Sequence, residues 1–141
     1  MTDPHRAFER ACSNAFVFLC ERFGFAAPEF EQLGREGYVQ FHKGSRTVSI
    51  AWEPGAAPLV ELFFPAQDSG DRPVPWAARN GVPYARRIPS LGPSAAFFQV
   101  NSVYRRRHVW NEPDESLFQR YLAEIAKQLA LVEAAFLTAD G

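Results

Sequence analysis

Acidic residues are missing from a long stretch of this sequence: none occurs between Asp71 and Glu112, although the chain has 16 Asp and Glu residues. The same stretch holds seven of the 15 Lys and Arg residues, all of them arginines: Arg72, Arg79, Arg86, Arg87, Arg105, Arg106 and Arg107. The net charge of −1 therefore conceals a basic window of +7, while the rest of the chain sums to −8. Charge segregated in this way shapes the local electrostatic field even when the total is near zero.

Cysteines and long apolar runs are also scarce. The two cysteines, Cys12 and Cys20, lie eight residues apart on a predicted helix, which separates them by about 12 Å along its axis. A disulfide requires Cα atoms within about 7 Å, so we expect two reduced, buried thiols and a cytoplasmic protein. No apolar run approaches the roughly 18 residues that span a bilayer, and the start, MTDPHRAFER, lacks the apolar region of a signal peptide. We expect no membrane partner.

Sequence signatures of catalysis and of cofactor binding are absent. His5, His42 and His108 are far apart in the sequence, and no Cys-x-x-Cys occurs, so no zinc site is predicted. The glycines form no Walker loop, dinucleotide fingerprint or nucleophile elbow. The sequence thus predicts no catalytic residue, no metal and no cofactor, and favours a protein that is not an enzyme. A small-molecule enzyme or sensor with a cleft beside Trp76 and Tyr84 is the third hypothesis.

The residues that are present are typical of one folded domain. With 141 residues, 47% of them hydrophobic, the chain can bury a core, so we predict a single domain over residues 1–141. The first element is a helix that Thr2 or Asp3 caps, with Pro4 in its first turn and Gly24 just past its end. Its predicted apolar face comprises Phe8, Cys12, Ala15, Phe16, Leu19 and Phe23.

The segment YVQFHKGSRTVSIAW predicts a β-hairpin with Gly44-Ser45 as its two-residue loop. This register pairs apolar residues on one face: Phe41 with Val48, Val39 with Ile50, and Gly37 with Trp52. A loop at Lys43-Gly44 would instead pair Phe41 with Arg46, so it is disfavoured. The segment LVELFF follows as a third strand of an antiparallel meander. The polar face of the hairpin carries Tyr38, Gln40, His42, Thr47 and Ser49.

The middle of the chain is harder to interpret. Residues 65–93 hold six of the 11 prolines and three of the nine glycines, which predicts a long irregular segment, with a short strand around 74–76 or 85–88 as alternatives. Residues 95–109 fit two patterns. A helix capped by Ser94 would align Phe97, Val100 or Asn101, Tyr104 and His108 on one face. A strand would place Phe98, Val100, Ser102 and Tyr104 on one face. Length and the cap favour the helix.

A second amphipathic helix is predicted from about Asp114 to Leu137. Its buried stripe is expected to contain Leu117, Tyr121, Ile125, Leu129 (or Gln128), Val132 and Phe136. We therefore predict an α+β fold: an N-terminal helix, an antiparallel meander of three or more strands, a long irregular segment, and C-terminal helices packed on one sheet face. The predicted core comprises Phe8, Phe16, Leu19, Phe23, Val39, Phe41, Val48, Ile50, Leu62, Leu129 and Val132.

The arginine window is the strongest candidate for a binding surface. Arginine forks match phosphate and carboxylate groups, and aromatic faces next to them can stack on a ligand. The candidate partner-binding residues are Arg86, Arg87, Tyr104, Arg105, Arg106, Arg107 and Trp110, with His42 on the polar face of the hairpin. The favoured partner is a protein with an acidic surface. The alternative is a nucleic-acid-associated protein that uses residues 72–110, but nucleic-acid binders are usually strongly basic, and here the sequence pI is about 6.3.

Four pieces of the chain carry a family resemblance: FLCERFGF, YVQFHKGSRTVSIAWEP, LVELFF and YLAEIAKQLALVEAAFLTAD. They cover both terminal helices and the meander. In these pieces the chain resembles a loose group of small uncharacterised bacterial α+β proteins, some of which are immunity proteins that neutralise a neighbouring toxin. The resemblance implies a helix–meander–helix fold and a protein-binding role, and it implies no catalytic residue. The proline-rich middle departs from the pattern and leaves the choice of partner open.

Overall fold

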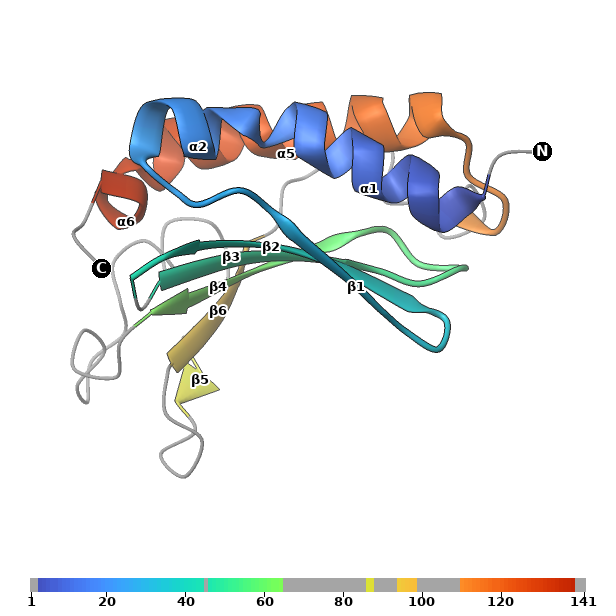
Figure 1. The fold of residues 1–141 in the computed structure, drawn as a ribbon, viewed down its shortest axis with the longest axis horizontal. Helices are drawn as coiled ribbons and strands as arrows, with labels where there is room; N and C mark the ends of the chain where they lie inside the picture. Colours follow the sequence, from blue (N-terminus) through green and yellow to red (C-terminus); the bar gives the residue numbers. More distant parts are fainter. Residues whose placement is uncertain (1–2, 45, 65–85, 88–93, 99–109, 139–141) are drawn as a thin grey trace.

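A layer of helices lies on one face of an antiparallel β-sheet (Figure 1). The computed structural model describes residues 3–44, 46–64, 86–87, 94–98 and 110–138. Helices from both ends of the chain lie on the same side of the sheet, which confirms the predicted α+β class. Within these ranges, no helix combines the length and the apolar character needed to cross a bilayer.

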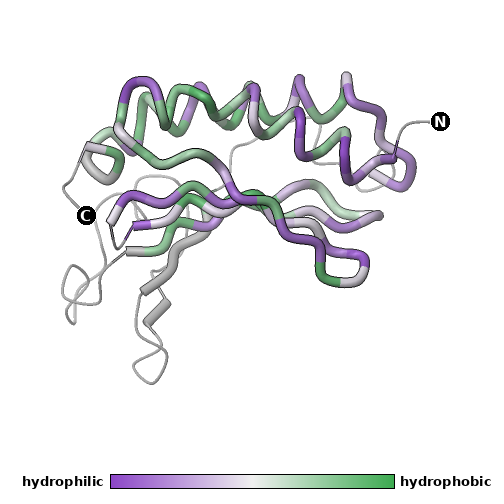
Figure 2. The backbone as a smooth tube through the Cα atoms, viewed as in Figure 1, coloured by the Kyte–Doolittle hydropathy of each residue, from purple (hydrophilic) through white to green (hydrophobic). Residues whose placement is uncertain are grey.

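The N-terminal helical segment is two helices, α1 (Pro4–Ala15) and α2 (Val17–Phe23), rather than the single helix expected. Phe16 separates them because its backbone, at φ −107° and ψ 13°, leaves helical geometry. Asp3 caps α1 through its side chain, and Gly24 ends α2 in the left-handed conformation at φ 81°, so both predicted caps are confirmed. Figure 2 shows apolar and polar stretches alternating along this helical layer, which is typical of helices that cover a core.

Six strands form the sheet in the order β1-β2-β3-β4-β6-β5, with every neighbouring pair antiparallel. Their bounds are β1 Glu29–Leu33, β2 Glu36–Lys43, β3 Arg46–Trp52, β4 Leu59–Phe64, β5 Arg86–Arg87 and β6 Ser94–Phe98. The predicted register between β2 and β3 is confirmed, with Phe41 opposite Val48 and Gly44 opening the loop at φ 60°. No apolar alternation predicts β1, because Phe30 is its only residue that packs against the core.

Strand β6 corrects one prediction: Ser94–Phe98 is a strand, and the preference for a helix capped by Ser94 is wrong there. The physical reason is pairing with β4, whose other edge would otherwise present unpaired backbone groups. Phe98 is buried opposite Val60. Strand β5 falls within the alternative strand at 85–88. The alternative strand at 74–76 and the remainder of 95–109 lie outside the described residues.

The C-terminal segment is α5 (Glu115–Val132) and α6 (Ala134–Thr138), interrupted at the buried Glu133. Asp114 caps α5 by accepting a hydrogen bond from the Leu117 backbone N–H at 2.8 Å. The buried stripe is wider than predicted, because α5 packs against α1 as well as over the sheet. It consists of Phe118, Tyr121, Leu122, Ile125, Ala126 and Leu129, whereas Leu117 is only half-buried.

The core lies between the two layers as one buried cluster. Nine of the predicted core residues are buried there, while Phe23 and Val132 are half-buried. At one end an aromatic group joins the layers. The ring of Phe118 lies 5.6 Å from Phe8, 5.0 Å from Trp52 and 5.5 Å from Trp110, measured between centroids. These contacts fix the position of Trp52 at the end of β3.

Candidate functional site

The strand register gives the sheet two faces of different character. One face packs under the helices, and within the described residues no helix covers the other, which we call the open face (Figure 1). Along β1–β4 its register positions are Glu29, Glu31, Leu33, Glu36, Tyr38, Gln40, His42, Thr47, Ser49, Ala51, Leu59, Glu61 and Phe63, with Glu53 just beyond β3. Five of these residues are glutamates and none is a lysine or an arginine. The open face of these strands is therefore acidic.

The basic residues of the same hairpin point to the opposite side. Lys43 donates a hydrogen bond to the Leu137 carbonyl at 3.0 Å and lies 5.7 Å from the Phe25 ring centroid. Arg46 is buried, with 6% of its surface exposed. Both cations thus belong to the helix side, so they do not neutralise the glutamates of the open face.

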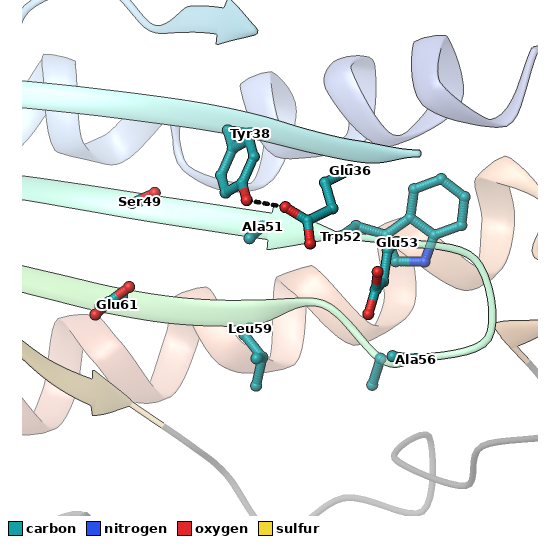
Figure 3. Close-up of a pocket in the computed structure, with 10 residues that line it drawn as sticks. Glu36, Tyr38, Ser49, Ala51, Trp52, Glu53, Ala56, Leu59 and Glu61 are labelled. Carbon is teal, nitrogen blue, oxygen red and sulfur yellow. Dashed lines mark hydrogen bonds between the residues drawn. The ribbon is translucent and has the colours of Figure 1, made fainter. Parts of the chain in front are cut away.

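A hollow opens on the open face where β3 turns into β4 (Figure 3). Its volume is about 220 Å³. We call it the β3–β4 hollow. The residues that line it are Glu36, Tyr38, Ser49, Ala51, Trp52, Glu53, Ala56, Ala57, Leu59 and Glu61. Three carboxylates and a phenol therefore surround a floor made largely of alanine and leucine.

The pKa of Tyr38 is raised by the carboxylates of the hollow. Its hydroxyl donates a hydrogen bond to a Glu36 carboxylate oxygen, drawn as a dashed line in Figure 3. That bond, with burial and the charges of Glu36, Glu53 and Glu31, raises the pKa of Tyr38 above its ordinary value of 10.0. The phenol therefore stays neutral and donating at physiological pH, and the potential around it is negative.

Trp52 contributes a hydrogen-bond donor that has no acceptor. The residue is 2% exposed, yet its Nε1–H has no acceptor in the part of the chain that the structure describes. Buried polar groups in proteins are almost always paired, so an unpaired donor requires an explanation. In the view of Figure 3 the nitrogen lies on the ring edge nearer Glu53 and Ala56.

Of the residues predicted to bind a partner, His42 and Arg86 occupy open-face register positions. The Nε2 of His42 is 3.3 Å from a Glu29 carboxylate oxygen, and its Nδ1 is 2.9 Å from the Thr47 hydroxyl. Arg86 and Arg87 form β5 at the far edge of the sheet. Four inter-strand steps separate β2 from β5, which is roughly 19 Å at about 4.8 Å per step. His42 and these two arginines therefore do not form one cluster.

The prediction that Trp110 binds a partner is wrong. The residue is fully buried, with its ring packed 5.3 Å from Tyr121 and 5.5 Å from Phe118. Its large apolar surface makes it a core residue, so it does not offer an exposed indole to a partner. The other candidates, Tyr104, Arg105, Arg106 and Arg107, lie outside the described residues.

Sequence reasoning identified Tyr38 and Ser49 as polar-face residues but missed Glu36, Glu53 and Glu61. The sequence pattern that could have identified them is the alternation of acidic and apolar residues, which places the acidic side chains on the face opposite the core. This pattern locates the three glutamates on one face only when the strand register is known, because they come from three separate strands or strand ends. Among the described residues, no three His, Cys, Asp or Glu side chains are grouped so that they could hold a metal ion.

Comparisons with protein-family models, with curated proteins and with solved structures found no match to this chain.

Proposed function

We propose that the chain is a cytoplasmic, non-enzymatic binding protein of immunity type, and that its protein partner lies against the open face of the sheet. The observation that supports this proposal most strongly is the charge of that face. Five glutamates and no lysine or arginine occupy its positions on β1–β4 and the residue after β3. Complementary charge steers partners together and orients them on contact.

An acidic face selects a basic partner surface. This differs from the acidic partner that the arginine window predicts, and the two predictions concern different residues, although Arg86, opposite Ala95 on β6, continues the open-face register at the far edge of the sheet. The open face also disfavours nucleic acid, because its carboxylates would repel phosphate groups. The nucleic-acid alternative depends on residues 72–110 and predicts oligonucleotide binding that weakens steeply with salt.

Site-specific crosslinking in the native host tests the proposal. A photo-crosslinking amino acid replaces Gln40, which lies on the open face outside the β3–β4 hollow, or Glu21, which is exposed on α2. We expect a discrete adduct with one protein from position 40 and none from position 21. The captured protein is then purified, and Gln40→Arg should weaken its binding because a cation is placed in the acidic face. Adducts of equal yield from both positions would count against the proposal.

A further inference from the structure

We infer that the β3–β4 hollow takes an arginine side chain from a segment of the partner protein, and that Trp52 donates a hydrogen bond to a backbone carbonyl of that segment. This inference rests on the proposed function, since it names the chemical group that the open face recognises. Three independent features of the hollow support it: opposed like charges, the unpaired donor, and its size.

Like charges face each other at the rim of the hollow. Gly37 pairs with Trp52, so Glu36, one residue before, and Glu53, one residue after, occupy the next opposed position. Like charges directly opposite in neighbouring strands destabilise a sheet. Local conflicts of this kind are typical of functional sites, where the cost is recovered on binding. A guanidinium between the two carboxylates would convert the repulsion into two attractive contacts.

The unpaired indole N–H defines the second requirement of the ligand. A guanidinium has five donors and no acceptor, so it cannot satisfy Trp52, but the carbonyl of the peptide that carries it can. Trp52 occupies a helix-side register position and its Nε1 has almost no accessible surface, so residues 53–58 must move outward when the segment binds. That loop contains Gly55, whose backbone N–H donates to the Trp110 carbonyl at 2.8 Å and anchors its far side.

The size and lining of the hollow fit one side chain. Its volume of about 220 Å³ is smaller than the roughly 300–1,000 Å³ of typical small-molecule pockets. Ala51, Ala56 and Leu59 offer apolar contact to a methylene stem. The Tyr38 ring offers a face on which a planar guanidinium stacks, which favours arginine over lysine.

The test uses the full chain and a fluorescent capped peptide with one central arginine, followed by fluorescence anisotropy at low salt. The citrulline peptide, which has the same shape without the charge, is expected to bind at least tenfold more weakly. Glu36→Gln and Glu53→Gln should each weaken arginine-peptide binding roughly two- to fivefold. Glu21→Gln on α2 is the matched control and should leave binding unchanged. Equal binding of the two peptides, or an equal loss with Glu21→Gln, would overturn the inference.

Two further binding measurements test the indole hydrogen bond and the need for a peptide carbonyl. Trp52→Phe keeps an aromatic ring but removes the donor, and should weaken peptide binding roughly two- to tenfold. Agmatine, which carries a guanidinium but no carbonyl, should bind far more weakly than the peptide and compete poorly with it. Agmatine binding as tight as the peptide's would show a small-molecule site and overturn the choice of a protein segment.

The stability of the free protein separates a binding role from a structural one. Glu53→Gln relieves the like-charge opposition, so it should raise the urea midpoint of unfolding while it weakens peptide binding. A lower midpoint would mean that Glu53 supports the fold, and would overturn its assignment to the hollow's ligand. If no arginine peptide binds but crosslinking at position 40 succeeds, the inference fails while the proposed function stands.

Discussion

Replacing Trp52 with phenylalanine should cost little stability, even though the residue is 2% exposed. The smaller ring leaves a cavity of roughly 40 Å³, worth about 1 kcal/mol at ~24 cal/mol per Å³. The contact with Phe118, at a centroid distance of 5.0 Å, weakens by up to about 1 kcal/mol. Against these losses, removal of an unsatisfied buried N–H recovers about 1–3 kcal/mol. The terms nearly cancel, so we expect a change within about 1 kcal/mol.

Urea unfolding at equilibrium measures this change, with Phe118→Leu as the matched control. Phe118 is equally buried and contacts the same aromatic group, but it has no polar atom, so its truncation has nothing to offset it. We expect the control to lose about 1–3 kcal/mol. A loss of more than about 3 kcal/mol from Trp52→Phe would show that the indole N–H is bonded in the free protein.

Three further predictions concern the helices and the titratable groups. Asp114→Ala should lower the free energy of unfolding by about 1 kcal/mol, and Asp114→Ser should restore most of it, as measured by urea unfolding, because the α5 cap needs a side-chain acceptor. Burial raises the pKa of both thiols, most strongly that of Cys12, so iodoacetamide should modify Cys20 first and reach Cys12 only on unfolding, as followed by mass spectrometry. Because the pKa of Tyr38 is raised in the folded protein, the neutral phenol adds to the free energy of unfolding below the ordinary tyrosine pKa of about 10. This stabilisation is lost as pH rises through the raised pKa. Glu36→Gln should lower the Tyr38 pKa, as measured by an NMR titration, because it removes the carboxylate that accepts the Tyr38 hydrogen bond.

The fold was predictable where local rules and packing agree. Asp3 and Gly24 mark helix ends by chemistry that acts within one turn, and the β2–β3 register follows from matching apolar residues across a two-residue loop. Strand β6 was not predictable in this way, because Ser94 is a good cap residue and the conformation is decided by pairing with β4 and β5. Tertiary pairing overrides a local signal in that case.

The candidate site was predictable only in part. The polar residues Tyr38 and His42 follow from hairpin alternation, which places them on the open face. The opposition of Glu36 and Glu53 follows from the pairing of Gly37 with Trp52, which the predicted hairpin register already contains. The unpaired donor of Trp52 has no signal in the sequence, since any buried tryptophan could find an acceptor.

The most direct test of an arginine-binding open face is the indole region of a ¹H–¹⁵N NMR spectrum of the full chain during titration with the arginine peptide. The Trp52 indole resonance is assigned by its loss in Trp52→Phe, and the buried Trp110 serves as an internal reference. We predict that the Trp52 Nε1–H signal moves downfield with the peptide, as an unpaired donor gains an acceptor, and that it moves further than the Trp110 signal. A stationary Trp52 signal at saturating peptide would contradict this prediction.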